Sequence, residues 1–393
     1  MDMQPLRGIT VVSLEQAIAA PYASRHLADL GARVIKVERP GVGDFARGYD
    51  TRVAGLSSHF VWTNRNKESL TLDVKDPRGL EILRRLLRES DVFLQNLAPG
   101  ATERAGLGAE RLQADNPRLV VCDISGYGAT GPYRSMKAYD LLVQSESGLL
   151  SVTGTESEMA KVGISVADIA AGMYAYSSVL AALIERDHTG KGAHLDVSML
   201  ESTVEWMGYP LYYAYDGAEP PPRSGAAHST IYPYGPFTAK DGKVVMMGIQ
   251  NDREWRRFCA MFLGDADLAG RPEFSTNTAR SEHRAELSAL IADRFAALTA
   301  DEATGALEDA AIAYATVNSM HDVWAHPQLA ARERWHQVGT PAGPVPALAP
   351  PGHGSTAPRM DPVPAVGEHT RRIVSALGYS PEEIDSLEAD GVV

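Results

Sequence analysis

Cysteines and metal-binding patterns are scarce in this 393-residue sequence. Its two cysteines, Cys122 and Cys259, lie far apart, and neither belongs to a Cys-x-x-Cys pair. His321 and His326 are five residues apart, which is off the i, i+4 spacing by which a helix presents two ligands to one ion. The sequence therefore argues against a disulfide framework and a cysteine zinc site, and we expect no bound metal.

An excess of positive charge and a long apolar run are also missing. Lysine and arginine number 37 against 50 aspartate and glutamate residues, which gives a formal net charge of −13. Such a balance disfavours non-specific binding to nucleic acid or to anionic lipid surfaces. The N-terminal MDMQPLRGITVV has no basic flank before an apolar core, and no apolar run approaches 18 residues without a polar interruption. We expect a cytoplasmic protein with no nucleic-acid partner and no membrane partner.

Common nucleotide-binding and hydrolase motifs are absent too. There is no Walker A loop, no G-x-S-x-G and no His-Glu-x-x-His. The stretch GVGDFARG at residues 41–48 follows an expected strand and places Gly41 and Gly43 as a dinucleotide loop would. Its third position is Ala46, and no helix pattern opens directly behind it, so the sequence argues against a nicotinamide or flavin site.

What the sequence does contain is an alternation of strand and helix patterns with short connections. The expected strands span residues 8–14, 32–38, 69–75, 91–96, 118–128 and 193–199, and the expected helices between them include 76–90 and one near 108–115. This alternation is typical of an α/β fold with a doubly wound parallel sheet, whose ligands gather at the carboxyl ends of the strands. After the proline-rich stretch 217–228, the patterns indicate a smaller α+β unit.

Basic residues recur in the loops that follow successive strands, although the protein as a whole is acidic. These residues, with one asparagine, are Arg39, Arg47, Arg65, Lys67, Lys75, Asn96, Arg104, Arg134 and Lys137. Each of them alone could be an exposed surface residue. Because the loops meet at one edge of a parallel sheet, together they resemble a pocket for a polyanion with a long neutral arm.

One acid, Asp168, stands inside an otherwise small or apolar run, GISVADIAAG at 163–172. The run opens a helical pattern that reaches about Leu183 and is apolar on nearly every face, so we expect a buried helix. An aspartate in the first turn can serve as an N-cap for the helix. The same place makes a carboxylate available at a positive helix end as a nucleophile or base, and the local pattern leaves both interpretations open.

The order and spacing of these segments resemble the family III CoA-transferases, which include formyl-CoA transferase and carnitine CoA-transferase. The resemblance rests on motifs spread over the whole chain: PLRGITVVSLEQAIAAPYASRHLADLGARVIKVERPGVGDFAR, NRNKESLTLDVKDPRG, DVFLQNLAPG, SGYGATGPY, ADIAAG, TGKGAHLDVSML, IYPYGPF and GEHT. It implies a large Rossmann-like CoA-binding domain formed by residues 1–215 and 330–393, a small α+β domain at 225–325, and linkers at 216–224 and 326–340. It also implies an interlocked, ring-like homodimer.

The resemblance assigns roles to individual residues. The family's catalytic aspartate falls on Asp168. Positions that line the family's CoA pocket fall on Ala17, Ile18, Ala19, Arg39, Leu72, Lys75, Asn96, Leu97, Arg104, Lys137 and Tyr139. Candidates to meet a second carboxylate of the acceptor acid are Arg47, Arg52, Arg223 and His228, each of which could equally be a surface residue. No tightly bound cofactor is implied, since CoA is itself a substrate.

The implied activity is transfer of CoA from an acyl-CoA donor, expected to be succinyl-CoA, to a small carboxylic acid through aspartyl anhydride and aspartyl-CoA thioester intermediates. The best candidates for the acceptor are C4–C5 dicarboxylates such as itaconate, mesaconate or citramalate. The glycine-rich loop of formyl-CoA transferase has no counterpart here beyond YPYGPF, which argues against oxalate.

Two alternatives stay open. Related 2-methylacyl-CoA racemases use a histidine–aspartate pair, but the matching position here is Tyr139 before Asp140, and a phenol of pKa about 10 is a poor base near neutral pH. A non-catalytic acyl-CoA-binding protein is the second alternative. The presence of Asp168 counts against it.

Overall fold

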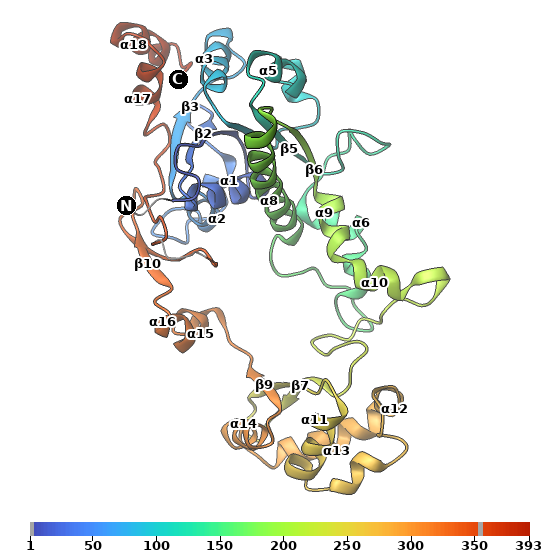
Figure 1. The fold of residues 1–393 in the computed structure, drawn as a ribbon. Helices are drawn as coiled ribbons and strands as arrows, with labels where there is room; N and C mark the ends of the chain where they lie inside the picture. Colours follow the sequence, from blue (N-terminus) through green and yellow to red (C-terminus); the bar gives the residue numbers. More distant parts are fainter. Residues whose placement is uncertain (1–3, 353–356) are drawn as a thin grey trace. The chain divides into compact units, whose positions relative to one another are not determined.

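The chain forms two compact units in the computed structural model, which describes residues 4–352 and 357–393 (Figure 1). Unit 1 comprises Met1–Gly148, Val162–Gly208 and Gln328–Val393, and unit 2 comprises Leu149–Lys161 and Tyr209–Pro327. Both ends of the chain therefore belong to unit 1. The expected large domain, 1–215 and 330–393, differs at residues 149–161 and 209–215, which group with unit 2.

Unit 1 is built on a six-stranded sheet in the spatial order β3-β2-β1-β4-β5-β6, and every neighbouring pair of strands is parallel. The strands are β1 (Thr10–Leu14), β2 (Arg33–Glu38), β3 (Lys67–Thr71), β4 (Val92–Gln95), β5 (Val120–Ser125) and β6 (His194–Ser198). The order reverses between β1 and β4, as in a doubly wound fold. The predicted α/β class with a parallel sheet is confirmed, and the edge at which all six strands end is called the carboxyl edge below.

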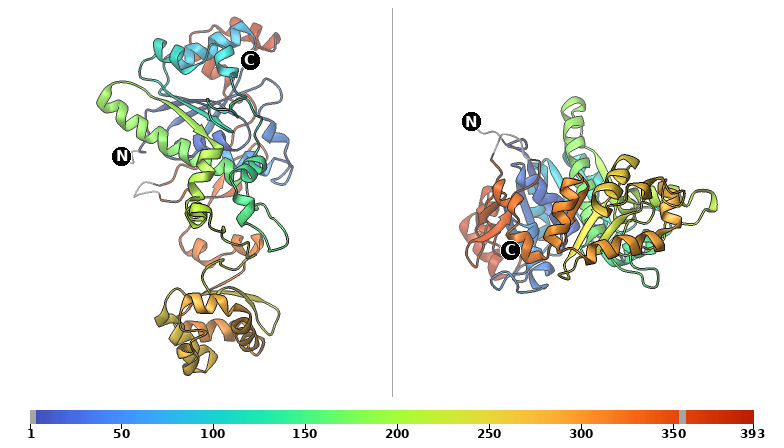
Figure 2. Two further views of the ribbon diagram at one scale, coloured as in Figure 1. Left: turned by 90° about the vertical axis from the view of Figure 1, so that its right-hand side faces the viewer. Right: turned by 90° about the horizontal axis from the view of Figure 1, so that it is seen from below.

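Helices cover both faces of this sheet (Figures 1 and 2). One face carries α1 (Ala19–Asp29) and α8 (Val166–Thr189), and the other carries α3 (Pro77–Arg88), α5 (Ala109–Asp115), α17 (Thr370–Ala376) and α18 (Pro381–Ala389). Shorter helices of unit 1 are α2 (Ser58–Thr63), α4 (Ala101–Arg104), α6 (Asp140–Glu146) and α9 (Met199–Trp206), with the 3₁₀ turn η1 (Phe45–Gly48). The faces are held by two apolar cores, one on each side of the sheet.

Helix α8 runs six residues further than the expected end at Leu183 and stops at Gly190, whose φ of 73° is left-handed. By length and composition alone it could cross a membrane, and 44 % of its most apolar window is buried inside the protein. Its buried alanines pack against α1 and the sheet. Within unit 1 one face of α8 therefore has the contacts of a core helix. The expected burial on nearly every face is not found in this chain, since Ile184 is 64 % exposed.

The C-terminal segment returns to unit 1 beside the edge strand β3. The His369 N–H donates to the Ser69 carbonyl at 3.0 Å, and the Thr71 N–H donates to the Thr370 hydroxyl at 3.0 Å. Ahead of this contact the chain forms the antiparallel pair β10 (Trp335–Val338) and β11 (Val345–Leu348). These bonds close one edge of the sheet with a distant part of the chain, which protects an otherwise open strand.

Unit 2 has a three-stranded antiparallel sheet in the order β7-β8-β9, packed with helices around one aromatic-rich core. Its elements are β7 (Tyr234–Thr238), β8 (Val244–Gly248), β9 (Ala313–Thr316), α7 (Leu149–Val152), α10 (Gly208–Tyr213), η2 (Tyr215–Gly217), α11 (Asp252–Arg257), η3 (Phe258–Leu263), η4 (Ala266–Gly270), α12 (Asn277–Glu282), α13 (Arg284–Ala296), α14 (Ala300–Asp309) and α15 (Met320–Trp324), and α16 (Pro327–Ala331) follows across the boundary. The Gly225 N–H donates to the Gly154 carbonyl at 2.7 Å, and Arg223 donates to the carbonyls of Thr155 and Glu156. These bonds explain why residues 149–161 belong with unit 2.

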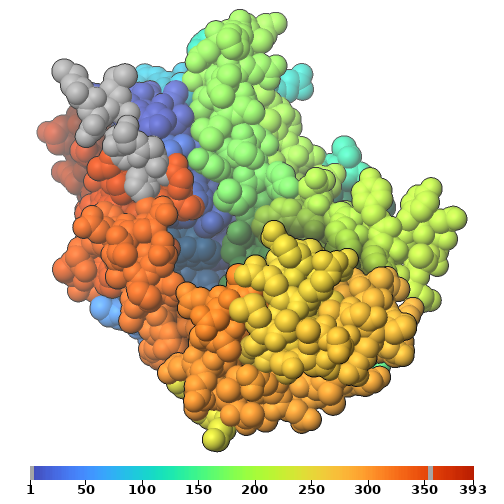
Figure 3. Space-filling model, turned by 60° about the horizontal axis from the view of Figure 1, so that its bottom comes forward, coloured from blue at the N-terminus to red at the C-terminus, as the bar shows by residue number. Residues whose placement is uncertain are grey.

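The segment of α10 and η2 is rich in exposed aromatic side chains. Tyr212 is 82 % exposed and Tyr215 is 75 % exposed, and Tyr209, Leu211 and Tyr213 are also exposed. Figure 3 shows this yellow-green segment at the molecular surface. A dense group of large apolar side chains in contact with water is characteristic of an interaction surface.

Candidate active site

The turn between β1 and α1 brings free backbone donors to the carboxyl edge. Ala17 adopts a left-handed φ of 62°, which costs a residue other than glycine about 1–2 kcal/mol. Ile18 follows as the N-cap of α1, and its apolar side chain accepts no hydrogen bond from the first turn of the helix. Within the part of the chain that the structure describes, the N–H groups of Ile18, Ala19 and Ala20 have no hydrogen-bond acceptor. Three donors at the positive end of a helix thus lack an acceptor, and the residues that carry them, Ile18, Ala19 and Ala20, are 3 %, 2 % and 0 % exposed.

Asn96, at the end of β4, fixes this turn from one side. Its side-chain carbonyl accepts from the Gln16 N–H and its amide donates to the Gln16 carbonyl, both at 2.9 Å. Asn96 was predicted to line the CoA pocket. In the structure its side chain supports the turn that carries Ala17, Ile18 and Ala19.

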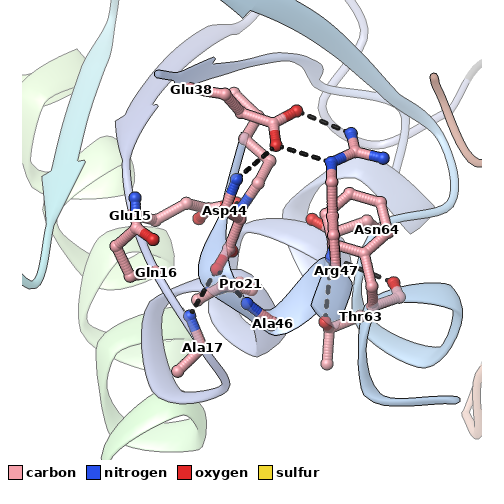
Figure 4. A network of polar contacts seen from close by, with 12 residues as sticks. Glu15, Gln16, Ala17, Pro21, Glu38, Asp44, Ala46, Arg47, Thr63 and Asn64 are labelled. Atoms are coloured by element: carbon pink, nitrogen blue, oxygen red, sulfur yellow. Dashed lines mark hydrogen bonds and ion pairs between the residues drawn. The ribbon is translucent and has the colours of Figure 1, made fainter. Parts of the chain in front are cut away.

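Asp44 fixes the same turn from another side (Figure 4). Its Oδ1 accepts from the N–H of Ala17 at 3.2 Å and from the N–H of Ala46 at 2.9 Å, while its Oδ2 meets Lys36 Nζ at 2.8 Å. The preceding Gly43 has a φ of 68°, and a Cβ there would lie 2.7 Å from a Glu38 carboxylate oxygen. The glycine-rich stretch 41–48 is therefore the turn that presents Asp44.

A fully buried charge network continues beneath Asp44. Lys36 and Glu15 lie 3.2 Å apart, and Lys67 donates to Glu15 at 2.8 Å, all three with side chains that are 0 % exposed. Burial alone would raise the pKa of Glu15, but the charges of Lys36 and Lys67 outweigh it and hold that pKa at about 2. Burial lowers the pKa of Lys36, yet Glu15 and the neighbouring carboxylates raise it to about 12. Every charge of this network has a partner, as buried ions require.

Asp168 stands on the first turn of α8, close to the start of α1. The two helices approach so closely that a Cβ on Gly172, one turn after Asp168, would lie 2.7 Å from the Ala19 carbonyl oxygen. The N-cap of α8 is Ser165, so Asp168 occupies the third helical position and not the cap. The capping function falls to Asp140 on α6, which accepts from the Ala167 N–H at 2.8 Å. The interpretation of Asp168 as an N-cap is wrong for this reason.

The carboxylate of Asp168 has no hydrogen-bond or ion-pair partner among residues 4–352 and 357–393. Burial raises its pKa to about 7, and the nearby negative charge of Asp140 adds to the increase. A carboxylate that is partly shielded from water and has no partner is less stabilised as an anion than one in full solvent, which favours a role as a nucleophile. Asp168 is therefore the candidate nucleophile or base of the carboxyl edge.

Tyr49 belongs to the same neighbourhood. Burial raises the pKa of its phenol, and the charges of Asp44, Asp168 and Tyr139 raise it further. Its ring packs on Phe45 and edge-on against His59, at centroid distances of 5.7 and 5.3 Å. Tyr49 was not among the predicted site residues, because nothing in the sequence distinguishes it from other aromatics in loops.

Most of the residues predicted to bind CoA follow the ends of strands at the carboxyl edge. Ala17 to Ala19 follow β1, Arg39 follows β2, Leu72 and Lys75 follow β3, and Asn96, Leu97 and Arg104 follow β4. Lys137 and Tyr139 lie in the loop after β5. Arg39, Lys75, Arg104 and Lys137 are exposed, and Leu72 is buried. The fold thus brings the predicted set to one edge and leaves its four cations accessible to a ligand.

Two of the basic residues assigned to the polyanion pocket are not available for it. Arg65 and Lys67 are 4 % and 3 % exposed. Arg65 pairs with Asp29 at 2.7 Å and Lys67 with Glu15. The expectation was wrong for both because β3 spans Lys67–Thr71 and so begins two residues before the expected strand. Arg65 and Lys67 therefore lie just before and at the start of β3, and not in a loop that follows a strand.

The residues predicted to meet the acceptor acid divide between the two units. Arg47 donates to both oxygens of Glu38 at 2.7 and 2.8 Å and to the Pro364 carbonyl, so its guanidinium is already occupied. Arg52 is exposed on the loop after Tyr49. In unit 2, Arg223 binds two backbone carbonyls, and the Nδ1 of His228 accepts from the N–H groups of Thr230 and Ile231. Arg52 is the one of the four whose side chain makes no hydrogen bond or ion pair within the described part of the chain.

The sequence analysis missed Glu15, Lys36 and Asp44. A signal for the first two exists: a glutamate directly after the buried strand pattern of 8–14 and a lysine inside that of 32–38 must pair if the strands are buried. Within the described residues, no group of three or more histidine, cysteine or acidic side chains could hold a metal ion.

The fold and the carboxyl edge define a class: an α/β protein of Rossmann type with an unpartnered carboxylate, Asp168, on the first turn of a helix. The comparison with known families gives the particular group. The chain belongs to the family III CoA-transferases, since the description "CoA-transferase family III" matches residues 6–370. The family predicted from the sequence is confirmed, and with it a CoA-transferase that uses CoA thioesters as substrates.

Similar proteins cover the whole chain. Human "Succinyl-CoA:glutarate CoA-transferase" is 34 % identical over 400 residues, covering 100 % of this chain and 90 % of the human protein. "Succinate--glutarate CoA-transferase" of Agrobacterium fabrum is 35 % identical over 390 residues, covering 95 % of this chain and 96 % of that one. The crystal structure of a CAIB/BAIF family protein from Brucella suis, 34 % identical, has a TM-score of 0.83 and covers 95 % of this chain and 99 % of that one.

Proposed function

We propose that this protein transfers CoA from succinyl-CoA to a C4–C5 dicarboxylate, with Asp168 as the covalent nucleophile. The observation that carries the proposal is the unpartnered, largely buried carboxylate of Asp168 on the first turn of α8, a helix whose next turn packs at Gly172 against the start of α1 with its free N–H groups. A carboxylate can attack a thioester carbonyl when it is desolvated and held in contact with it. Exchange of one thioester for another needs no external energy source.

The first half of the reaction moves CoA onto the protein. A carboxylate oxygen of Asp168 bonds to the succinyl carbonyl carbon, the C–S bond breaks, and CoA leaves as a thiolate, which gives a succinyl–aspartyl anhydride. The thiolate then attacks the carbonyl carbon of the Asp168 side chain, the anhydride C–O bond breaks, and succinate leaves. The product is an aspartyl-CoA thioester.

The second half repeats these steps with the acceptor. The acceptor carboxylate attacks the aspartyl thioester, CoA thiolate leaves again, and an acceptor–aspartyl anhydride forms. Attack of the thiolate on the acceptor carbonyl gives the acceptor CoA ester and restores the Asp168 carboxylate. No net proton is taken up or released in the cycle.

The negative charge that develops on each carbonyl oxygen needs hydrogen-bond donors. The N–H groups of Ile18, Ala19 and Ala20 are free in the described chain and lie at a positive helix end. In a site without water such donors stabilise an oxyanion strongly and need no reorganisation. The exposed cations Arg39, Lys75, Arg104 and Lys137 would hold the phosphates of CoA, whose binding energy then acts at the distant thioester.

The acceptor is proposed from the relatives and from one residue. Both relatives named above carry glutarate in their names, so glutarate is the first acid to test, ahead of itaconate, mesaconate and citramalate. Arg52 is the candidate for the acid's second carboxylate, because its guanidinium is exposed while that of Arg47 is bound to Glu38.

We further propose a homodimer, interlocked as the family resemblance implies, that acts in the cytoplasm. The exposed aromatic segment of α10 and η2 supports a partner surface, since leaving Tyr212 and Tyr215 in water is unfavourable. Light scattering during size-exclusion chromatography tests the dimer, and a monomeric mass at micromolar concentration would exclude it.

The activity is tested by incubating the protein with succinyl-CoA and each of glutarate, itaconate, mesaconate, citramalate, oxalate and acetate, and measuring new CoA esters by chromatography with mass detection. A dicarboxylate ester formed at a rate proportional to enzyme supports the proposal. Absence of transfer to every acid, together with exchange of the α-proton of a 2-methylacyl-CoA in deuterated water, would make the protein a racemase. Binding of CoA with neither reaction would make it a non-catalytic acyl-CoA-binding protein.

A further inference from the structure

We propose that Asp44 is a positioning residue for the acyl-CoA: its Oδ1 holds the Ala17 N–H and thereby keeps the β1–α1 turn in the conformation that offers its free donors to the thioester. The inference rests on the proposed function, since it assumes that this turn lines the CoA pocket. Asp44 itself need not touch the substrate, because it is 0 % exposed. Figure 4 shows its carboxylate directed at the Ala17 N–H.

The turn needs a holder because its conformation is unfavourable by itself. Ala17 has a φ of 62°, a region that alanine avoids because of its Cβ. Without a bond to its N–H group, this residue would populate ordinary negative φ values, and the peptide groups of Ile18 and Ala19 would turn away with it. A ligand that binds only the left-handed turn would then bind more weakly, in proportion to the lost population.

Asp44 is suited to this role because it is itself held firmly. One oxygen bridges the N–H groups of Ala17 and Ala46, so that the turn is tied to η1. The other oxygen is paired with the buried Lys36 at 2.8 Å, and the Asp44 N–H donates to Glu38 at 2.9 Å. The carboxylate therefore has one orientation, in which Oδ1 points at the turn.

The arrangement also explains why charges are buried at this place. A buried ion pair contributes little net stability, and an apolar pair of similar volume often replaces it without loss. In the Lys36–Asp44 pair, the Asp44 oxygen that does not meet Lys36 holds the strained turn at Ala17, which gives this buried pair a function. Lys36 then serves to orient Asp44, and Asp44 serves to orient Ala17.

The decisive experiment compares two double variants that both remove the buried pair. Asp44→Asn/Lys36→Met keeps a side-chain oxygen for the Ala17 N–H, whereas Asp44→Leu/Lys36→Met removes it. Both lose the same charges, so a purely structural role predicts equal behaviour. The dissociation constant of CoA is measured by calorimetry, and kcat and KM for succinyl-CoA are measured in the transfer assay, on proteins whose folding is checked by circular dichroism.

The asparagine variant is expected to bind CoA within about threefold of the original protein, and the leucine variant about tenfold more weakly, with a matching rise in KM for succinyl-CoA. Equal affinity of the two variants would overturn the role of Asp44. If the leucine variant does not fold, Asp44→Ala/Lys36→Met takes its place, since alanine also lacks the acceptor and fits the space. Failure of the original protein to bind CoA would instead overturn the proposed function.

A third substitution distinguishes the effect of the Asp44 bond to the Ala17 N–H from that of its bond to the Ala46 N–H. Glycine adopts left-handed φ values without the cost that alanine has. Adding Ala17→Gly to the leucine variant is therefore expected to recover at least about threefold of the lost CoA affinity. If the triple variant binds as weakly as the leucine variant, the loss came from the Ala46 contact, and the positioning of Ala17 is not the role of Asp44.

Discussion

The acids at the carboxyl edge of the sheet differ in whether their carboxylates have hydrogen-bond and ion-pair partners. Glu15 and Asp44 are fully buried, and lysine ammonium groups and backbone donors occupy their oxygens. Asp168 has no such partner in the described chain, and its pKa is about 7 where that of Glu15 is about 2. The comparison separates a carboxylate that fixes a backbone from one that we propose to react.

The difference follows from what each carboxylate must do. An acid that accepts several charge-assisted hydrogen bonds is stabilised as an anion and is a weak nucleophile. When burial and a neighbouring negative charge act on an acid and no donor binds it, its anion is destabilised. Attack on a carbonyl then relieves the negative charge. An unpaired carboxylate at Asp168 destabilises the folded protein, and contacts elsewhere in the fold must offset this cost, as is usual at active sites.

The largest effect is expected from replacing the reactive acid. Asp168→Asn should lower the rate of CoA transfer by at least about a thousandfold, because the amide cannot form the anhydride. Turnover with succinyl-CoA and glutarate measures this loss. CoA affinity serves as the control and should stay within a few-fold. If Asp168→Asn keeps a tenth or more of the original rate, Asp168 is not the nucleophile, and the proposed difference between it and the paired acids is wrong.

Replacing a paired acid should instead affect stability. Glu15→Gln removes the carboxylate that Lys36 and Lys67 share, and should destabilise the protein by up to about 3–5 kcal/mol in urea titrations at pH 7.5. Lys36 keeps its pair with Asp44, and burial lowers the pKa of Lys67 to about 7, so the Lys67 side chain can lose its proton. The matched control is Glu185→Gln on the exposed face of α8, which should change stability by less than about 0.5 kcal/mol. Equal effects at the two positions would show that the buried network does not hold the fold.

The reactive acid should cost the fold stability, with a defined pH dependence. In the folded protein the pKa of Asp168 is raised to about 7, so at higher pH folding buries an unpaired charge, and this cost disappears as pH falls through 7 toward the unfolded value near 4. Asp168→Asn should therefore be more stable than the original protein by about 1–3 kcal/mol at pH 8, and by roughly half as much or less at pH 5. Calorimetric unfolding at the two pH values measures it. An advantage that grows toward low pH would contradict the raised pKa.

The smallest expected effect is in the pH profile of the reaction. Only ionised Asp168 attacks the thioester, so the rate at low succinyl-CoA concentration should rise about tenfold from pH 6 to pH 8 and level off above pH 7. Single-turnover release of free CoA, trapped by a thiol reagent, gives the rate at each pH. A profile that is flat over this range would mean that the pKa of Asp168 is ordinary and that it resembles the paired acids.

The sheet was predictable because its strands are buried on both faces and alternate with helices, a pattern that sequence periodicity reveals. The misplaced elements have local causes. Strand β3 ends at Thr71 because the chain turns at Asp73, whose carboxylate accepts the Lys75 N–H at 3.0 Å. Residues 149–161 belong with unit 2 through Arg223 and Gly225, contacts between positions far apart in the sequence that no local pattern encodes.

Asp168 stands out in the sequence as a single acid at the start of an apolar helix, and its catalytic role stays a prediction. Its environment could not be predicted. That Asp140 caps α8 and leaves Asp168 free depends on where α6 lies. The role of Asp44 depends on the left-handed φ of Ala17, which a sequence with alanine at this place does not suggest. Charges inside strand patterns were the one available signal for the buried network.

The most direct test of the contrast between the two kinds of acid is mass spectrometry of the protein after incubation with succinyl-CoA and trapping with hydroxylamine. The account predicts a modification that maps to Asp168 and to no paired acid, and that is absent from Asp168→Asn. A modification on Glu15 or Asp44, or none on Asp168 while transfer proceeds, would contradict it.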